Sequence, residues 1–320
     1  MDEKVRLSRR GFVGAAAGAA AASAATWAPA ASAQGGGGGA LLPRSNIGIQ
    51  LWTVRDRVEA LGFDAVFKEL SSQGYAEIEF AGYNGQGRRW TNQELRNLLR
   101  RYRLKAIGSH VGYTSDDPNA YTFVTQLDQV LEDAAEIGMP FIGTASNPGD
   151  RFGQTVDGYK RAAEDFNRFG AAARRLGLRF YQHNHFDEFK VVDGQRLYDV
   201  ILAETDPRLV FFEMDIFWAH VGQTTYPGFR PHDYPWRMPE RFPLFHVKDG
   251  TFDRTSEGET EGWTMTDVGA GQVPLEPFFY GLERDEHHFL AERDTFPPDG
   301  TFAGSERDYD WMAGLREQGG

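Results

Sequence analysis

Eight short apolar segments alternate with longer amphipathic segments along most of this chain, and this alternation constrains its fold more than any other feature. The apolar segments predict strands at Gly48–Thr53, Glu77–Ala81, Lys105–Val111, Phe141–Thr144, Arg179–His185, Val210–Asp215, Leu244–Lys248 and His288–Glu292. Because no linker-like stretch divides them, one closed parallel barrel fits better than two domains. We therefore predict a single α/β domain of the (β/α)8 barrel class.

The amphipathic segments between the strands predict helices. They cover Phe63–Ser72, Asn92–Tyr102, Tyr121–Ile137, Val156–Leu176, Gly194–Glu204 and Leu275–Glu283, with a weaker pattern around Trp311. Thr91 and Glu94 have the spacing of a capping box at the start of the second helix. A doubly wound open sheet is the alternative fold, but no glycine-rich phosphate-binding turn follows the first predicted strand. The Pro-, Tyr- and Trp-rich stretch Gly222–Arg241 interrupts the sixth unit and is either a substrate-covering loop or an ordinary surface excursion.

The first 33 residues predict an export signal. Arg9 and Arg10 precede an alanine-rich run that ends in small residues suited to cleavage after Ala33, a pattern that resembles a twin-arginine signal. The run is short and rich in Ala and Gly, so we expect no stable membrane insertion. The predicted organisation is a signal peptide at 1–33, a Gly-rich linker at 34–46 and the barrel at 47–320, with folded structure from near Leu41. We expect an exported protein, periplasmic or extracellular.

Composition excludes several classes of function. The chain has no cysteine, which rules out a disulfide scaffold, a zinc–thiolate module and a cysteine nucleophile. It carries 34 Lys and Arg against 46 Asp and Glu, a net charge of −12. Such a chain repels a polyanion, and we expect no nucleic-acid partner.

Ionisable residues recur two positions apart at the ends of the predicted strands. The pairs are Glu77 and Glu79, His183 and His185, Glu213 and Asp215, His246 and Lys248, and Glu292 and Asp294. This spacing points both members of a pair to one face of a strand, and at the carboxyl end of a barrel that face can line the mouth. Four of the eight histidines, including His110, fall at strand ends. Mixed imidazole and carboxylate donors suit a divalent ion such as manganese, cobalt, zinc or iron.

Seven stretches carry a resemblance to a known family. They are Gly48 to Asp56 (GIQLWTVRD), Ile78 to Tyr83 (IEFAGY), Tyr181 to Phe189 (YQHNHFDEF), Phe212 to Trp218 (FEMDIFW), His246 to Asp249 (HVKD), Asp267 to Gly271 (DVGAG) and Ala291 to Asp294 (AERD). With them the chain resembles the xylose isomerase-like TIM-barrel proteins, a family of sugar isomerases and epimerases, from Ile47 to about Gly314. The resemblance implies one divalent metal ion, held by Asp215, His246 and Glu292. It also implies that His183 replaces the glutamate that commonly supplies the fourth ligand.

The same resemblance implies proton abstraction next to a carbonyl of a sugar, through an enediolate. Glu292 is the first candidate for the base, and Glu213, Glu79, His185 and His110 are the alternatives. Returning the proton gives isomerisation or epimerisation, whereas expelling a β-substituent gives elimination. Loss of one family glutamate makes a lyase that cleaves 3-keto-glycosides the second hypothesis.

The substrate is expected to be a non-phosphorylated sugar or glycoside, because sugar phosphates are mainly cytosolic and the last two strands lack a phosphate-binding turn. Lys248 either stabilises developing negative charge or neutralises Asp215 or Asp249. Gln50 and Trp52 are expected to contact the substrate, and so is Trp218. Tyr83 and Phe217 are further candidates for ring stacking.

Three other possibilities stay open at this stage. A phosphodiesterase acting on abasic DNA shares the barrel but needs three metal ions and a basic face. A non-catalytic exported sugar-binding protein would bind without exchanging a substrate proton. The chain is also compatible with a homo-oligomer.

Overall fold

The structure is a computed structural model that describes residues 39–82, 90–253, 262–280, 282 and 286–317, all within one compact unit. The signal peptide predicted at 1–33 lies outside these residues, as does Tyr83. Among the described residues, no helix combines the length and apolarity that crossing a bilayer needs.

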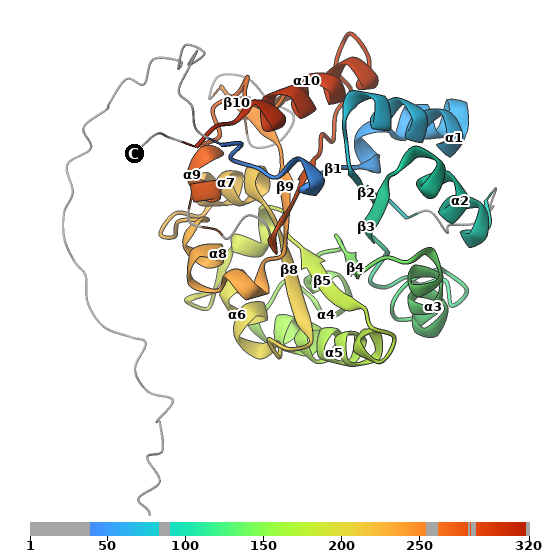
Figure 1. Ribbon diagram of the computed structural model, residues 1–320. Helices are drawn as coiled ribbons and strands as arrows, with labels where there is room; N and C mark the ends of the chain where they lie inside the picture. Colours follow the sequence, from blue (N-terminus) through green and yellow to red (C-terminus); the bar gives the residue numbers. More distant parts are fainter. Residues whose placement is uncertain (1–38, 83–89, 254–261, 281, 283–285, 318–320) are drawn as a thin grey trace, which may run out of the picture. The chain divides into compact units, whose positions relative to one another are not determined.

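Eight parallel strands form the central sheet (Figure 1). They are β1 (Ile47–Gln50), β2 (Glu77–Phe80), β3 (Lys105–Ser109), β4 (Phe141–Thr144), β5 (Arg179–His183), β8 (Val210–Asp215), β9 (Leu244–Val247) and β12 (His288–Ala291). Their order is β3-β2-β1-β12-β9-β8-β5-β4. The two outer strands approach each other at the end of β3, where His110 pairs with Gly143 and the N–H of Val111 donates to the Gly143 carbonyl at 2.8 Å. The predicted (β/α)8 barrel is confirmed.

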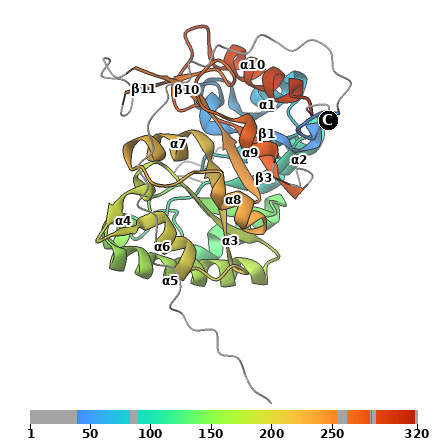
Figure 2. The same ribbon diagram turned by 90° about the vertical axis from the view of Figure 1, so that its left-hand side faces the viewer.

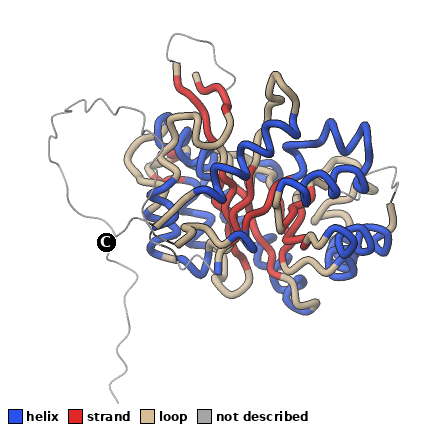
Figure 3. Tube along the Cα trace, turned by 45° about the horizontal axis from the view of Figure 1, so that its top comes forward, coloured by secondary structure: helices blue, strands red, loops and turns tan. Residues whose placement is uncertain are grey.

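Helices surround the strands, as Figure 3 shows. They are α1 (Arg55–Gln73), α2 (Asn92–Tyr102), α3 (Leu127–Ile137), α4 (Gly149–Phe152), α5 (Val156–Arg175), α6 (Leu197–Glu204), α7 (Ile216–Thr225), α8 (Asp233–Arg237), α9 (Glu276–Tyr280) and α10 (Thr301–Gly314). Helices α1 and α10 lie on the opposite side of the barrel from α3 and α5 (Figure 1 and Figure 2). The short hairpin β6 (Val191–Val192) and β7 (Gln195–Arg196) precedes α6. A second hairpin, β10 (Asp249–Phe252) and β11 (Trp263–Thr266), follows β9 and projects from the barrel.

Local sequence signals place several element ends. The side chain of Thr91 accepts the N–H of Glu94, and Glu94 accepts the N–H of Thr91, so the predicted capping box is present. Helix α3 ends at Gly138, whose φ of 92° is a left-handed conformation that glycine adopts without strain. The predicted first strand ends early, because the Gln50 side chain accepts the Trp52 N–H and begins the 3-10 helix Leu51–Val54.

Other predicted segments also differ from the structure. The helix predicted at Phe63–Ser72 starts earlier, at Arg55. The helix expected from Tyr121 begins at Leu127, because residues before it form turns, including a bridge between Gly112 and Thr122. The stretch Gly222–Arg241 continues α7 and then forms α8, where the Tyr234 ring lies 6.3 Å from that of Phe189. Within the described residues it lines no part of the cavity presented below, which favours the surface-excursion interpretation.

Two apolar clusters build the core. The larger fills the space between strands and helices, and it includes Leu41 and Leu42, so this end of the expected linker packs on the barrel. The smaller lies inside the barrel and consists of Ile107, Phe141, Tyr181, Leu244 and Leu290. It forms an apolar floor beneath the polar side chains that follow along the same strands.

Candidate metal centre

Four side chains from four adjacent strands meet inside the barrel. His183 ends β5, Asp215 ends β8, His246 lies in β9 and Glu292 follows β12. One donor atom from each lies within 4.8 Å of the donor atoms of the other three, and all four residues are buried. Asp215 Oδ2 is 3.7 Å from Nε2 of His183 and 3.9 Å from Nδ1 of His246, and Glu292 Oε2 is 2.6 Å from that Nδ1. We call this set the upper group.

The chemistry of the upper group fits a divalent cation. Asp215 Oδ2, His246 Nδ1 and Glu292 Oε2 are buried and have no hydrogen bond of normal geometry within the described residues. Lys248 Nζ lies 2.9 Å from Asp215 Oδ2 and 2.6 Å from Glu292 Oε2, so both oxygens already face one cation. The converging lone pairs of the two oxygens and of His246 Nδ1 match those that a metal ion takes. The other oxygen of Asp215 accepts the N–H of Trp218 at 2.8 Å and so caps α7.

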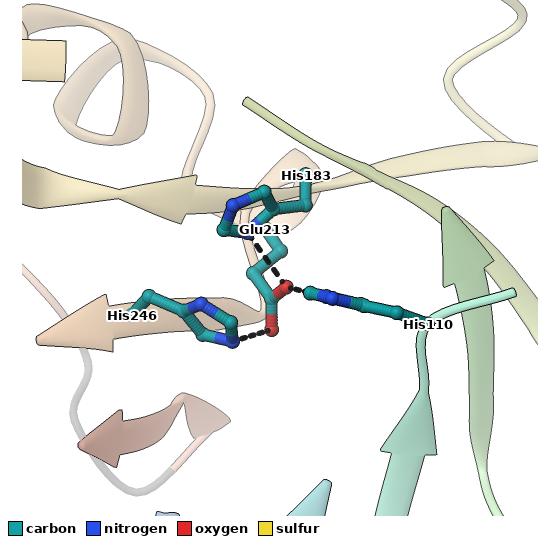
Figure 4. Close-up of side chains that lie close together, drawn as sticks. All are labelled: His110, His183, Glu213 and His246. Atoms are coloured by element: carbon teal, nitrogen blue, oxygen red, sulfur yellow. Dashed lines mark hydrogen bonds and ion pairs between the residues drawn. The ribbon is translucent and has the colours of Figure 1, made fainter. Parts of the chain in front are cut away.

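A second set of side chains surrounds Glu213, which lies two positions before Asp215 on β8 (Figure 4). Its Oε2 is 2.8 Å from Nε2 of His110 and 3.1 Å from Nδ1 of His183, and its Oε1 is 3.1 Å from Nε2 of His246. We call His110, His183, Glu213 and His246 the lower group; their donor atoms also lie within 4.8 Å of one another. His183 and His246 therefore belong to both groups, each through a different ring nitrogen.

Lys248 places a cation beside the upper group. Its Nζ is 2.9 Å from Asp215, 2.6 Å from Glu292 and 3.0 Å from Asp294. This position suits a cation that stabilises developing negative charge and one that neutralises Asp215. Lys248 does not neutralise Asp249, whose carboxylate accepts backbone N–H groups instead.

Opposing effects set the protonation of the centre. Burial raises the pKa of Asp215 to about 6, although Lys248 and His246 oppose the shift. Burial alone would raise the pKa of Glu292 as well, but Lys248 and His246 hold that pKa well below its usual value. Burial lowers the pKa of His183 well below its ordinary value, so this imidazole stays neutral, the form in which histidine binds a metal.

A cavity of about 500 Å³ opens next to the upper group. The titratable side chains that line it are His110, His183, His185, Lys248, Glu292 and Asp294. Burial, with Lys248 nearby, lowers the pKa of His185 to about 3. The cavity also contacts Trp52, which is 44% exposed and stacks on Arg55.

The structure separates the other predicted site residues by depth. Glu79 and Glu213 are fully buried and absent from the described cavity lining, so neither is placed to take a proton from a substrate there. Gln50 is also buried, and its amide donates to Glu79 at 2.7 Å. Trp218 lies behind the wall, with its ring 5.7 Å from Lys248 and 6.0 Å from His185. Neither of these two expected substrate contacts is among the described residues that line the cavity.

Glu77 is at the wrong end of the barrel for the predicted site. It begins β2 and accepts a hydrogen bond from His288, the first residue of β12, at 2.7 Å. Glu77 and Glu79 do share a face, but two residues span about 6.6 Å along a strand, so they lie in different layers.

Several residues of the centre had no role assigned from the sequence. Asn184 accepts the Asp215 N–H at 3.1 Å and donates to the Asp215 carbonyl at 3.3 Å, which fixes the end of β8. The sequence signal that could have indicated this role is the position of Asn184 between His183 and His185. Tyr121 and Ser146 line the cavity, and they come from loops with no distinctive sequence pattern.

Comparisons with known proteins agree with this fold. A family model described as xylose isomerase-like TIM barrel matches residues 56–312. A sugar phosphate isomerase/epimerase from Parabacteroides distasonis is 21% identical, with a TM-score of 0.64 over 89% of this chain and 97% of that one. No curated protein matches the sequence significantly.

Two further solved structures share the barrel. A probable 3-DHS dehydratase from Bacillus anthracis is 16% identical, with a TM-score of 0.58 over 81% of this chain and 97% of that one. The IolI protein, crystallised with a zinc atom, is 11% identical, with a TM-score of 0.61 over 82% of this chain and 95% of that one. At these identities the solved structures support the fold, and the family model assigns the membership. This chain belongs to the xylose isomerase-like TIM barrel family.

Proposed function

We propose that this chain is a divalent-metal-dependent enzyme that removes a proton next to the carbonyl of a non-phosphorylated sugar or keto-sugar, as sugar isomerases and epimerases do. The observation that carries the proposal is the upper group, His183, Asp215, His246 and Glu292, whose donor atoms converge beside a cavity. An ion held there supplies Lewis-acid chemistry, which polarises a carbonyl and acidifies the neighbouring C–H bond.

In this proposal His185 is the candidate base. Its pKa of about 3 leaves the imidazole unprotonated but makes it a weak base, so proton transfer would depend on a bound ion acidifying the C–H bond. The imidazole of His185 lines the cavity, and its side chain has no hydrogen bond among the described residues. Glu292 also lines the cavity, but Oε2 already lies between Lys248 and His246. In this proposal Glu292 is a ligand, and it remains the alternative base through its other oxygen. The Lys248 ammonium faces the cavity and stabilises negative charge that develops on the substrate oxygen.

A neutral substrate follows from the charges around the cavity. Lys248 is the only lysine or arginine among the described lining residues, and three carboxylates already hold its ammonium. No further described cation there is available to compensate a phosphate dianion. This argument supports a sugar, an oxidised sugar or a glycoside over a sugar phosphate.

Elimination from a 3-keto-glycoside is the second candidate function. Inverting a stereocentre by two bases needs a second base facing the first across the substrate, whereas elimination needs one base and an acid for the leaving group. Among the described lining residues, the carboxylates are Glu292 and Asp294, and both contact Lys248. This arrangement has no second free carboxylate among the described lining residues to act as the facing base. It does supply His185 as a base and Lys248 as an acid, the two groups that elimination needs.

The test combines metal analysis with exchange of substrate protons. The metal-loaded protein is incubated in D2O with a panel of aldoses, ketoses and 3-keto-glycosides, and products are followed by NMR. Deuterium next to the carbonyl supports the proposal, and release of an aglycone identifies the lyase. Glu292→Gln is expected to abolish both reactions, while Glu306→Gln, an exposed carboxylate on α10, serves as the matched control.

Two outcomes would reject the proposal. One is a protein that binds no manganese, cobalt, zinc or iron. The other is a metal-loaded protein that binds sugars without exchanging any substrate proton, which would identify a sugar-binding protein.

We also propose that the protein is exported by the twin-arginine route, on the basis of Arg9, Arg10 and the small residues up to Ala33. Expression in a bacterium with an active twin-arginine pathway, followed by mass spectrometry of the periplasmic protein, tests this. Cleavage near Ala33 is expected, and replacement of Arg9 and Arg10 by lysine should retain the precursor in the cytoplasm. Retention of residues 1–33 on exported protein would contradict the proposal.

A further inference from the structure

The lower group raises the question of what Glu213 does. Glu213 is fully buried, and it contacts His110, His183 and His246 rather than the cavity. Two of these imidazoles are also members of the upper group. A carboxylate in this position is either the ligand of a second ion or a group that orients the ligands of the first.

Ions in both groups at once would require each shared imidazole to bridge two metals. His183 would use Nδ1 below and Nε2 above, and His246 would use Nε2 below and Nδ1 above. A neutral imidazole offers one lone pair, so both rings would have to lose their remaining proton. The two groups are therefore alternatives for a single ion.

Hydrogen bonding decides between the two groups. In the lower group, Glu213 Oε2 already accepts from His110 at 2.8 Å and from His183 at 3.1 Å. In the upper group, three of the four donor atoms have no hydrogen bond of normal geometry in the described part of the chain, although the Lys248 ammonium contacts Asp215 and Glu292; in the lower group, Glu213 Oε1 alone lacks one. The upper group is therefore the better site for the ion. The side chains of the lower group stay connected by hydrogen bonds.

From this contrast we infer that Glu213 is a positioning residue that fixes which nitrogen of each shared histidine faces the metal. It holds the proton of His183 on Nδ1, which leaves Nε2 as a lone pair directed at the upper group. On His246 the Nε2 atom lies 2.7 Å from Glu79, which accepts its hydrogen bond, and 3.1 Å from the negatively charged Glu213, which leaves Nδ1 for the ion. The nitrogen that binds a metal is set by the hydrogen bond that the other nitrogen makes.

This inference also gives a reason for the imidazole at position 183. A carboxylate there has no N–H to donate to Glu213 and would place a second buried negative charge 3 Å or so from the first, which is unfavourable. His183 and Glu213 are therefore matched to each other. The inference rests on the proposed function only in requiring a metal ion in the upper group.

The test is a titration of metal-free protein with Co²⁺, whose absorption bands report the ligand geometry. Wild-type protein is expected to bind one ion. Glu213→Gln is expected to bind it about 10- to 100-fold more weakly with altered bands. Glu213 faces His183 with one oxygen and His246 with the other, and in glutamine an NH2 group replaces one of these acceptors. The matched control is Glu77→Gln, which removes another buried carboxylate that accepts from a histidine, His288, at the opposite end of the barrel. It should leave affinity and bands unchanged.

Each result has one meaning. Two ions per wild-type chain, or wild-type affinity and bands in Glu213→Gln, would overturn the inference and leave the proposed function standing. No binding by wild-type protein would overturn the proposed function itself.

A second measurement covers the case in which Glu213→Gln does not fold. The wild-type protein, labelled with ¹⁵N-histidine and loaded with Zn²⁺, is examined by NMR for the protonated nitrogen of each coordinated ring. One imidazole bound through Nε2 and one through Nδ1 is the expected pattern. Two rings bound through the same type of nitrogen would exclude the assigned role of Glu213.

Discussion

The centre concentrates more negative than positive side chains in a buried volume. Glu79, Glu213, Asp215 and Glu292 are all buried there, and Lys248 is the one lysine among the residues they contact in the described structure. Desolvation makes uncompensated carboxylates costly, and an additional cation or bound protons must offset them. A divalent ion in the upper group would supply that charge at the point where the donor atoms lack hydrogen bonds.

A first prediction at the residue scale concerns the base. His185→Gln is expected to lower kcat by at least about 100-fold, because general-base catalysis contributes on that order, while metal content stays at the wild-type value. His220→Gln is the matched control, since His220 lies on α7 against the Trp263 ring and does not line the cavity. Substrate deuterium exchange in D2O measures both variants. Wild-type exchange in His185→Gln would return the role of base to Glu292.

A second prediction concerns Glu188, which lies in the 3-10 turn Asp187–Phe189 after β5, three residues beyond His185. Its Oε2 accepts the backbone N–H of His185 at 3.0 Å, and burial raises its pKa to about 8. Between the ordinary pKa near 4.5 and about 8, the folded state binds more protons than the unfolded state, so stability falls as pH rises through this window.

Glu188→Gln cannot ionise and should lose this dependence. The free energy of unfolding is measured with urea at pH 5 and at pH 9. Between these pH values, wild type should lose more than about 1.4 kcal/mol relative to the variant, which is the equivalent of one pKa unit. The exposed Glu306→Gln should follow the wild-type slope. Parallel pH profiles for Glu188→Gln and wild type would contradict the assigned pKa.

At the scale of elements, one carboxylate anchors the β10–β11 hairpin and the loop that follows it. Asp249 is the first residue of β10, and it accepts the backbone N–H groups of Gly250, Gly269, Gly271 and Val273 at 2.8 to 3.0 Å. A Cβ on Gly271 would lie 2.1 Å from the Asp249 carboxylate, so the loop approaches too closely for any other residue. The hairpin is thereby held next to Lys248 and the centre.

Asp249→Asn is expected to destabilise the protein by about 2–3 kcal/mol. In the variant an NH2 group replaces one carboxylate oxygen, so a donor faces backbone N–H donors that have lost their acceptor. Asp310→Asn, an exposed position on α10, is the control. Chemical unfolding followed by circular dichroism measures both. Equal stability of Asp249→Asn and wild type would mean that the four backbone groups find other partners.

Helices and strands were largely predictable, and their exceptions have local causes. The helix Asn92–Tyr102 and the strands Phe141–Thr144 and Val210–Asp215 were predicted with the bounds that the structure has. The first strand was predicted too long, because the side chain of Gln50 begins a 3-10 turn that the apolar pattern does not reveal. Periodicity reports burial, whereas a side-chain cap depends on one particular contact.

At the scale of the whole molecule, an ion in the upper group would connect four neighbouring strands, β5, β8, β9 and β12. Binding to the folded state alone at 100 times Kd adds about 2.7 kcal/mol to stability. For a domain of this size, removing the metal should lower Tm by roughly 5 °C. Differential scanning calorimetry with EDTA and with added Mn²⁺ or Zn²⁺ measures the change.

The shift should require the upper group. Glu292→Gln is expected to lose most of the metal-dependent change in Tm, and Glu77→Gln should keep it. A metal-dependent shift of the same size in Glu292→Gln would place the ion elsewhere in the molecule.

The sequence by itself determined the barrel and the kinds of donor atoms at the ends of its strands. It did so because strand and helix periodicities report burial, and spacing of two residues reports a shared face. Only the tertiary structure decided the height of each side chain along the barrel axis. That height separates Glu213 and Glu79, buried among imidazoles, from Glu292 and His185 at the cavity. Residues on one face of a strand differ in height by about 6.6 Å for every two positions, and the reach of a side chain to the cavity depends on that distance.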